Sequence, residues 1–393
     1  MEVKHKQNGR LIFHQLYKRK MKKIVIIGGG LAGLINAILL SRKGLKVQLY
    51  EKKVFPFHKV CGEYISNEVL DFLTREGLLP NNLTLPVINK FQLTSIKGNA
   101  IATSLALGGF GVSRYLLDDF LKNSAIEAGA NITEGIAVSN VSFNSNSRVY
   151  DYSLSNGEKH QAELLIGAYG KKCRIDNQLK RAFTLRPSSF IGVKYHIKTE
   201  APLDTVSLHN FPKGYCGLSP IEDGKFNLCY LGNSALLKKS GSLAAYEDLY
   251  VKQNPFLKDI FNQSEFIFDK PEVINAFSFN PKKPVEDHLF MSGDAAGLIT
   301  PLCGNGMALA IHSAYLLSQI IIKNVKNEKI NNFQIEKEYC QTWEKHFRKR
   351  LWYGRKVQTL FGSAITSEIA VGMIKTVPKF GELLIRLSHG KPF

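Results

Sequence analysis

A glycine-rich turn near the N-terminus constrains the fold of this chain more than any other sequence feature. The turn, Gly-Gly-Gly-Leu-Ala-Gly from Gly28 to Gly33, directly follows Ile24–Ile27, an apolar run with the length of a buried strand. A helical pattern then runs from about Leu31 to Lys43, Gly44 ends it, and a second apolar strand is expected at Val47–Tyr50. The order strand, helix, strand is typical of a βαβ unit, so we expect an α/β fold.

The same unit carries the residues that a bound dinucleotide requires. Gly28 permits the tight turn, Gly30 lets the backbone approach a pyrophosphate, and Gly33 lets the helix pack closely on the strand. The helix start offers free N–H groups to the phosphates, and Glu51, at the end of the second strand, is placed to accept hydrogen bonds from ribose hydroxyls. The glycine pattern alone is a weak signal, but with strand, helix and terminal acid it predicts a dinucleotide site.

Length, charge and cysteine content limit the class of protein. The chain has 393 residues, enough for two or three domains, and 44% of them are hydrophobic, which excludes a disordered chain. The net charge of +19 favours anionic partners. The six cysteines include no CxxC pair, so zinc ribbons and dithiol redox motifs are excluded, no metal is expected, and a reducing cytoplasm is favoured.

No run has the length of a membrane span, and the first residues do not resemble a secretory signal. Residues 1–20 are basic and lack an apolar core, so we interpret them as a tail and Met21 as a functional start.

A second glycine-rich turn returns late in the chain. A strand is expected from Leu289, the turn Gly293-Asp294-Ala295-Ala296-Gly297 follows it, and a long helix is expected over about Gly306–Ile322. Because two elements of nucleotide type lie far apart in the sequence, we expect one cofactor domain built from separated segments, with a substrate domain inserted between them.

Together the two turns resemble the flavoprotein superfamily of para-hydroxybenzoate hydroxylase and geranylgeranyl reductase. In that superfamily a Gly-Asp pair precedes a proline and a Gly-x-Gly helix start, and the aspartate binds the ribityl or pyrophosphate part of FAD. The matching residues here are Asp294, Pro301 and Gly304-Asn305-Gly306. A helix that begins near Met307 directs its positive dipole end at the flavin edge where negative charge accumulates on reduction. The resemblance therefore implies bound FAD.

Two further segments extend the resemblance to the cofactor site. Ser113-Arg114 looks like the arginine that begins a helix beside FAD, although a solvated arginine at a helix start is the alternative. Leu164–Gly170 resembles a Gly-Ala-Asp-Gly strand end, but Tyr169 replaces the aspartate. Since that motif is associated with NAD(P)H as well as FAD, NAD(P)H stays open as the electron donor.

Two more segments resemble the geranylgeranyl reductases in particular. Lys59-Val60-Cys61-Gly62-Glu63 is similar to their Lys-x-Cys-Gly element. Gly214–Pro220 is similar to their Gly-Tyr-x-Trp-x-Phe-Pro substrate element, with Gly217 and Ser219 in place of the two aromatic residues.

The resemblance implies a set of cofactor-binding residues drawn from all these segments. They are Gly28, Gly30, Leu31, Ala32, Gly33, Glu51, Lys52, Lys59, Cys61, Arg114, Gly170, Gly293, Asp294, Pro301, Gly304, Asn305, Gly306 and Met307.

Three residues are candidates for catalysis. Cys61 either packs as a small hydrophobic residue or serves as a redox or proton-transfer thiol, although without a second cysteine it cannot perform disulfide exchange. Glu63 is a candidate acid that faces the substrate, and Tyr215 is a candidate to donate or orient a proton. We expect the substrate to meet the flavin between Lys59–Glu63, Pro301–Gly306 and the sheet that carries Tyr215.

The resulting architecture is a Rossmann-type FAD/NAD(P)-binding domain interleaved with a mostly antiparallel β-sheet substrate domain. The expected FAD-binding domain covers residues 21–90, 108–175 and 275–330, and the substrate domain covers 91–107 and 176–274. Residues 331–393 are expected to be helical and peripheral.

A basic helix in this C-terminal region has two interpretations. Trp343, Phe347 and Leu351 stand four residues apart and form one face among basic residues such as Arg348 and Lys349. The face either packs on the body of the protein or lies on anionic lipid. A nucleic-acid partner is not expected, because no recognition motif accompanies the charge.

The resemblance implies an FAD-dependent oxidoreductase of the geranylgeranyl-reductase type, acting on a hydrophobic lipid, polyketide or quinone-type substrate. An aromatic-ring monooxygenase is the first alternative, and a membrane-surface binding protein with a structural FAD is the second. A flavin halogenase is disfavoured, because Trp343 and Trp352 cannot form the Trp-x-Trp-x-Ile-Pro signature. The expected location is cytoplasmic, with a peripheral membrane contact left open.

Overall fold

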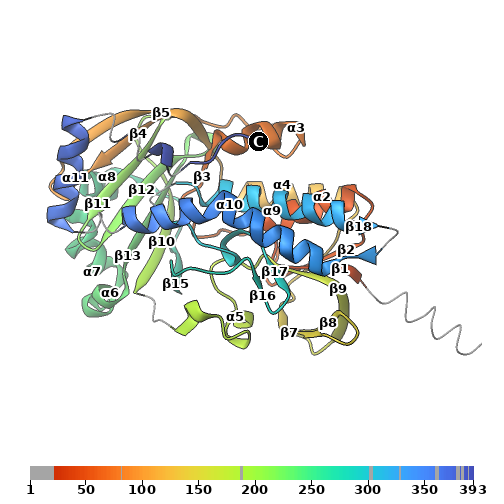
Figure 1. The fold of residues 1–393 in the computed structure, drawn as a ribbon. Coiled ribbons are helices and arrows are strands. Elements are labelled where there is room, and N and C mark those ends of the chain that lie inside the picture. Colours follow the sequence, from red (N-terminus) through yellow and green to blue (C-terminus); the bar gives the residue numbers. More distant parts are fainter. Residues whose placement is uncertain are drawn as a thin grey trace, which may run out of the picture.

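The structure is a computed structural model, and it describes residues 22–80, 82–185, 189–300, 304–326, 329–358, 363–377, 381, 385–387 and 389–393. Within these ranges the strands form two large sheets with helices packed around them (Figure 1). The expected tail, Met21 and Pro301 lie outside the described residues.

The first sheet is mainly parallel and presents both glycine-rich turns at one edge. Its strands in spatial order are β16 (Val285–Glu286), β17 (Leu289–Met291), β9 (Lys159–Gly167), β1 (Lys22–Ile27), β2 (Val47–Glu51) and β6 (Asn131–Glu134). All but β16 run parallel to their neighbours, and β7 (Val138–Asn144) and β8 (Val149–Leu154) continue the sheet antiparallel from β9. Because Gly28, Glu51, Ala168 and Gly293 follow or end neighbouring parallel strands, they meet at the same carboxyl edge.

Three helices cover the first sheet. They are α2 (Leu31–Arg42), α4 (Arg114–Glu127) and α9 (Gly306–Asn324), and α2 contacts both of the others. Among the helices in the described ranges, α9 alone is long and apolar enough to cross a membrane, but most of it is buried in this core. It is therefore a core helix of the first domain.

The second sheet is antiparallel except for the β11–β4 pair. Its strands in spatial order are β14 (Glu265–Phe266), β10 (Phe190–Lys198), β13 (Phe226–Asn233), β12 (Gly214–Pro220), β11 (Thr205–Phe211), β4 (Val87–Thr94), β5 (Ala100–Gly111) and β3 (Tyr64–Ser66), and β15 (Glu272–Phe277) also pairs with β10. The expected fold class, an interleaved α/β architecture with a mostly antiparallel second sheet, is confirmed.

The two faces of the second sheet differ because strand side chains alternate. On β10, Val193 and Tyr195 pack against helices α7 (Leu243–Leu249) and α8 (Pro255–Gln263). The opposite face packs toward the first domain and is covered in part by α11 (Ala364–Thr376).

Short elements connect and cap the two sheets. They are η1 (Asn67–Val69), α3 (Leu70–Arg75), α5 (Arg174–Gln178), η2 (Ala182–Leu185), η3 (Glu222–Gly224), α6 (Ser234–Ser240), η4 (Val251–Gln253), η5 (Gly293–Ala295), β18 (Val325–Lys326) and β19 (Lys329–Ile330).

The sheet membership differs from the expected domain boundaries at two places. Residues 275–277, at the end of β15, pair with β10 in the second sheet although they were assigned to the FAD-binding domain. β3, the start of β4 and the end of β5 all pair within the second sheet, although residues 64–66, 87–90 and 108–111 were assigned to the FAD-binding domain. The reason is physical: β4 and β5 form one antiparallel hairpin, and a hairpin is not divided between two sheets.

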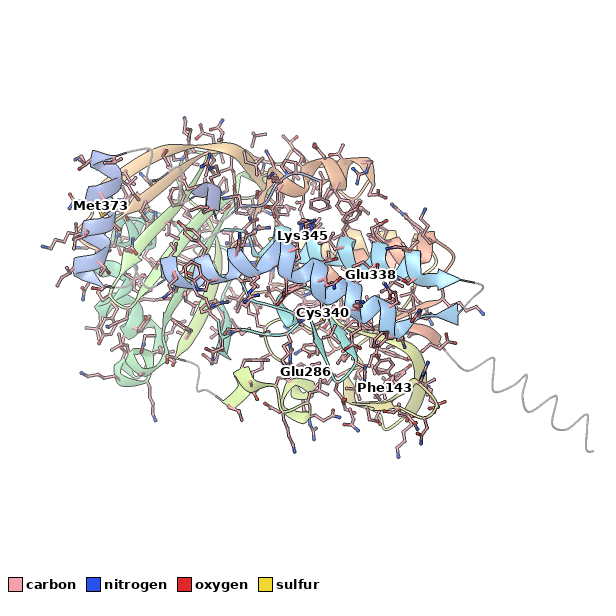
Figure 2. All side chains as sticks on the ribbon, viewed as in Figure 1. Phe143, Glu286, Glu338, Cys340, Lys345 and Met373 are labelled. Carbon is pink, nitrogen blue, oxygen red and sulfur yellow. The ribbon has the colours of Figure 1, made fainter. Side chains whose placement is uncertain are left out.

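The basic helix α10 (Asn332–Gln358) packs on α9 and crosses the molecule in Figure 2, where Glu338, Cys340 and Lys345 are labelled along it. Trp343, Phe347 and Leu351 are buried against the core. The packing interpretation of this stripe is therefore confirmed, and the interpretation that it faces lipid is wrong, because the stripe has no access to a membrane.

Candidate functional site

The first glycine-rich turn has no room for side chains at two of its positions. Gly28 has a φ of +103°, and a Cβ there would lie 2.7 Å from the carbonyl oxygen of Ala168. A Cβ at Gly33 would lie 1.9 Å from the carbonyl oxygen of Gly28, which no side chain tolerates. The turn therefore depends on glycine, as the sequence predicts.

Glu51 closes the turn from the end of β2. Its Oε2 accepts a hydrogen bond from the Gly29 amide at 2.7 Å, and its Oε1 accepts one from the Lys53 amide at 3.1 Å. A carboxylate offers about four acceptor positions, so acceptor capacity remains for ribose hydroxyls. Leu31 and Ala32 are buried at the start of α2, whereas Lys52 is exposed on the loop after Glu51.

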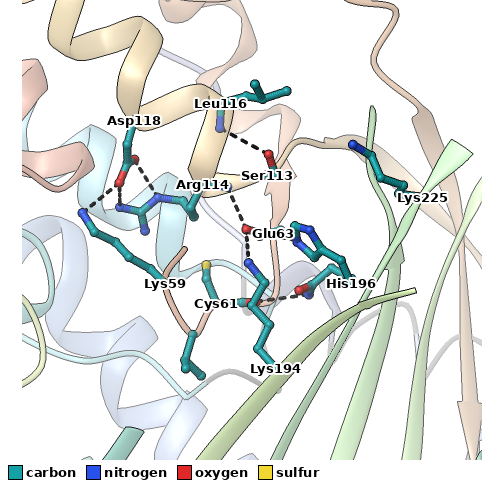
Figure 3. Close-up of polar contacts among 12 residues, drawn as sticks. Lys59, Cys61, Glu63, Ser113, Arg114, Leu116, Asp118, Lys194, His196 and Lys225 are labelled. Atoms are coloured by element: carbon teal, nitrogen blue, oxygen red, sulfur yellow. Dashed lines mark hydrogen bonds and ion pairs between the residues drawn. The ribbon is translucent and has the colours of Figure 1, made fainter. Parts of the chain in front are cut away.

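Two cations lie beside Gly30, and one carboxylate holds both of them (Figure 3). Arg114 donates two hydrogen bonds of 2.7 Å to Asp118, and Lys59 Nζ donates to Asp118 at 2.8 Å and to the Gly29 carbonyl at 3.1 Å. A Cβ at Gly30 would have Arg114 Nη2 at 3.6 Å and Lys59 Nζ at 3.9 Å as its nearest neighbours.

The charges of this cluster suit a pyrophosphate. Burial alone would raise the pKa of Asp118, but Arg114 and Lys59 more than offset it and hold that pKa below its usual value. Burial would likewise lower the pKa of Arg114, yet Asp118 raises it above the ordinary value. Two cations against one carboxylate leave one net positive charge beside Gly30, next to the N-terminus of α2.

The second glycine-rich turn touches the first. A Cβ at Gly293, whose φ is +65°, would lie 2.9 Å from the Cβ of Ala32. Burial raises the pKa of Asp294, while Lys171, Lys282 and Arg114 lie close enough to oppose that rise. The structure thus brings Asp294 and Arg114, which lie far apart in the sequence, into one site.

The start of α9 is held by a buried network. Asn305 Nδ2 donates to Glu68 Oε2 at 3.1 Å, and Arg350 of α10 donates to the same carboxylate at 3.1 Å. Gly304 has a φ of +61° and lies against Tyr64, while Gly306 and Met307 form the first turn of the helix. These contacts fix the helix terminus beside the second glycine-rich turn.

The end of β9 also lies at the site. Ala168 donates its amide to the Ile27 carbonyl at 2.8 Å, and Gly170 follows with a φ of +82°. Tyr169 stands where the resembled motif has an aspartate. Its hydroxyl donates a hydrogen bond to Asp176 of α5 at 2.9 Å.

Glu63 is the centre of a buried cluster that joins the first domain to the second sheet (Figure 3). Its Oε1 accepts hydrogen bonds from Lys194 Nζ at 2.5 Å and from the Arg114 amide at 2.7 Å, and its Oε2 lies 2.6 Å from His196 Nε2. Burial would raise the pKa of Glu63, but Lys194 and His196 hold it below its usual value. A carboxylate that is engaged in this way is disfavoured for the predicted acid role.

His58 completes the outer side of this cluster. Its ring stacks on Tyr115 with centroids 4.6 Å apart and meets the His196 ring edge-on at 5.1 Å. Burial and the nearby Lys194 lower the pKa of His58 to about 4, so this ring is neutral at neutral pH.

Cys61 and Tyr215 lie at different parts of the second sheet's inner face. Cys61 is partly buried beside Arg114, and its carbonyl accepts from Asn227 of β13 at 3.1 Å. Tyr215 pairs with Leu231, four residues further along β13, which is about 13 Å at the ordinary rise of a strand. The structure therefore joins Cys61 to the cofactor turns, whereas Tyr215 belongs to an apolar region of the same face.

Several residues of the site were not assigned a role from the sequence. Asp118 follows Arg114 by four positions on a helix, a spacing that signals an ion pair. Lys194 and His196 alternate with the apolar residues Val193, Tyr195 and Ile197 on β10, which signals a polar inner face. Within the described residues no group of three or more His, Cys, Asp or Glu side chains is arranged to hold a metal ion.

The family comparison agrees with this geometry. A family model described as "FAD binding domain" matches residues 21–332. The residues that line the two turns fit such a cofactor, because Gly30 leaves room beside two cations and Glu51 retains acceptor capacity.

Curated relatives are about a quarter identical to this chain over the aligned residues. Conditioned medium factor receptor 1 of Dictyostelium discoideum is 26% identical and covers 82% of this chain. Tryptophan 2-halogenase of Chondromyces crocatus is 24% identical and covers 83% of it. The matches span 68% and 65% of those two relatives, or about two thirds of their length. Digeranylgeranylglycerophospholipid reductase 1 of Methanopyrus kandleri is 23% identical, over 92% of this chain and 96% of the relative.

Solved structures share the fold. The flavin-dependent brominase Bmp2 superposes with a TM-score of 0.70 at 19% identity, over 94% of this chain and 93% of that one. The flavin-dependent halogenase CmlS superposes with a TM-score of 0.71 at 22% identity, over 84% of this chain and 63% of that one.

Proposed function

This chain belongs to the FAD binding domain family and is an FAD-dependent oxidoreductase, and we propose that it reduces a hydrophobic, prenyl-type lipid. The family and the cofactor agree with the sequence prediction. The substrate class goes beyond what the family match shows. It draws on the name of the Methanopyrus relative, which covers nearly the whole of both chains, and on the character of the second sheet.

The observation that carries the proposal is an apolar wall on the inner face of the second sheet. Leu93, Leu208, Tyr215 and Leu231 form it, and Leu298, from the loop that carries Asp294, packs against them. One loop thus connects the cofactor turn with a buried apolar cluster. A prenyl chain held against this cluster would lie beside the cofactor with little water, which favours a hydrophobic substrate over a polar one.

Gly217 provides room at this wall. It lies next to Tyr215 in the alternation of β12, and a Cβ there would meet nothing closer than the Cys229 carbonyl at 3.7 Å. Because the resembled reductases carry tryptophan at this position, the glycine supports a wider or more branched substrate.

Each group of residues has a distinct task in this proposal. FAD, when bound, supplies hydride transfer to carbon. Lys59, Arg114 and the start of α2 bind the pyrophosphate, and Glu51 binds ribose hydroxyls. The apolar wall orients the lipid and excludes water. Cys61 has its side chain beside Arg114, and in this proposal its thiol gives a proton to the second carbon of the double bond that is reduced.

An oxygen-dependent reaction is the second candidate. The likeness to Tryptophan 2-halogenase and to a brominase favours it. Against a halogenase, Trp343 is packed between Tyr339 and Phe347 in the core, and both tryptophans belong to α10 rather than to the cofactor turns.

Product analysis distinguishes the candidates. The holoprotein is incubated with digeranylgeranylglycerophospholipid and NADH, NADPH or dithionite, with and without oxygen and with and without bromide. The proposal expects hydrogen gain by the lipid without oxygen. A product that forms only with oxygen and contains a new oxygen or bromine atom would instead establish the second candidate.

Loss of the Cys61 thiol should lower turnover and leave the cofactor in place. We expect Cys61→Ala to retain FAD and to reduce the rate by roughly a hundredfold, because a positioned proton donor contributes at least that much. Cys340→Ala, on α10, is the matched control and should keep the parent rate. Equal rates in the two variants would show that Cys61 only packs as a small hydrophobic residue.

Loss of the Glu51 carboxylate should weaken FAD binding. A hydrogen bond to a charged group contributes roughly 1.5–3 kcal/mol, so Glu51→Ala should raise the FAD dissociation constant roughly ten- to a hundredfold. Titration calorimetry measures this directly. Glu265→Ala, which removes an exposed carboxylate from the second sheet, should bind FAD as the parent does.

A further inference from the structure

Helix α11 exposes one apolar stripe along its length. Ile365, Ile369 and Met373 stand four residues apart and are 73%, 55% and 48% exposed. Val377, directly after the helix, is exposed as well. Figure 2 shows Met373 on the outer edge of the molecule, on the side away from α9. Large side chains that are exposed in a row on one face mark an interaction surface.

Contacts on the opposite face of α11 hold the helix with this stripe facing outward. Val371 and Ile374 are buried in the apolar wall with Tyr215 and Leu231. The Glu368 carboxylate accepts hydrogen bonds from the Lys97 amide at 3.1 Å and from Asn99 Nδ2 at 2.8 Å. The helix is therefore anchored on both sides, and rotating the stripe inward would break these contacts.

Two exposed lysines lie at α11, and a third lies near it in the sequence. Lys375 is exposed on the last turn of α11, and Lys97 is exposed in the β4–β5 turn that holds Glu368. Lys356 lies over the exposed ring of Trp352 near the end of α10, a short stretch of chain before α11. Glu368, the single acidic residue in the sequence of α11, is already used in contacts to Lys97 and Asn99. An apolar stripe with a basic rim is complementary to an anionic lipid surface.

We propose that α11 is a membrane-docking helix, which lies on anionic phospholipid with Ile365, Ile369 and Met373 at the boundary of headgroups and acyl chains. This inference goes beyond the proposed function and does not rest on it, because it concerns binding and not turnover. The proposed membrane contact lies at α11 and not at α10, because the apolar stripe of α11 is exposed and that of α10 is buried.

The position of α11 would connect a docked membrane with the apolar wall of the second sheet. Its outer face would contact lipid while its inner face, through Val371 and Ile374, forms part of the apolar wall. A lipid that leaves the bilayer at this helix would therefore be next to the wall where we place the substrate.

Co-sedimentation with vesicles tests the proposal on the full-length holoprotein. Vesicles contain either equal parts of phosphatidylglycerol and phosphatidylcholine or phosphatidylcholine alone. We expect the parent to bind the anionic vesicles more tightly, and added salt to weaken binding. The triple variant Ile365→Ser/Ile369→Ser/Met373→Ser should bind at least about tenfold more weakly, since binding scales with the apolar area inserted. Lys375→Gln should bind about fivefold more weakly than the parent.

The matched control removes exposed apolar side chains elsewhere. Leu203→Ser/Phe333→Ser changes two exposed residues outside α11 and should bind like the parent. Bound-flavin absorbance of each variant reports whether its fold is intact. The proposal is overturned if the parent binds neither vesicle, or if the triple variant binds as well as the parent. It is also overturned if light scattering shows a dimer that the triple variant abolishes, because the stripe would then belong to a second copy of the chain.

Discussion

Replacing Gly33 by valine is expected to eliminate FAD binding. A Cβ at this position would lie 1.9 Å from the carbonyl oxygen of Gly28, so the glycine-rich turn and α2 have to separate. The obstacle is backbone and not a flexible side chain, and the cost therefore exceeds the roughly 1–3 kcal/mol of an overpacked core. We expect the affinity for FAD to fall by more than about a hundredfold.

Flavin content after purification and titration with FAD measure this effect. The matched control is Gly372→Val on α11, where a Cβ meets open space and where stability should change by less than about 0.5 kcal/mol. Thermal unfolding of both variants separates loss of the cofactor from loss of the fold. A Gly33→Val protein with the parent's flavin content and affinity would refute the assignment of this turn.

The second large effect is expected at Glu63. Glu63→Gln leaves Lys194 buried without its anion, and breaking a buried ion pair by removing one partner costs about 3–5 kcal/mol. Adding Lys194→Met to this variant should recover part of the loss, because the unpaired charge is removed. Glu265→Gln is the control, because Glu265 pairs with Lys198, which lies on β10 with Lys194, and this exposed pair should contribute less than about 1 kcal/mol.

Chemical denaturation at several pH values tests the electrostatic part of this account. The pKa of Glu63 is lowered in the folded protein, so its contribution is fully present above the unfolded value of about 4.3. That contribution is lost as the pH falls through the lower folded pKa. The parent should therefore lose stability toward acid more steeply than Glu63→Gln does. Parallel pH profiles for the two proteins would mean that Glu63 is not held as a carboxylate.

The cofactor turns could be predicted because their signals are local. Gly28 to Gly33 and Glu51 lie within one βαβ unit, whose spacing is set by the geometry of strand and helix. The second turn was found in the same way. The assignment of both Asp294 and Arg114 to the cofactor site followed from the resemblance, and their nearness depends on the packing of α4 against α2 beside the second turn.

The cluster around Glu63 could not be predicted, because its members come from three separate segments. Lys194 and His196 lie more than 100 residues after Glu63, and only the packing of the second sheet on the first domain brings them together. The same holds for α10 and α11. Periodicity identified the apolar stripe of α10 but not that of α11, and burial of the first stripe and exposure of the second depend on tertiary packing.

We propose that this FAD-dependent oxidoreductase passes electrons to a hydrophobic lipid. The most direct test is an anaerobic single turnover, in which dithionite-reduced holoprotein, freed of excess dithionite, is mixed with digeranylgeranylglycerophospholipid and the flavin absorbance is followed. We predict that the oxidised flavin spectrum returns without oxygen and that the lipid gains two hydrogen atoms for each flavin oxidised. A flavin that stays reduced until oxygen is admitted, with the lipid unchanged before that point, would contradict the account.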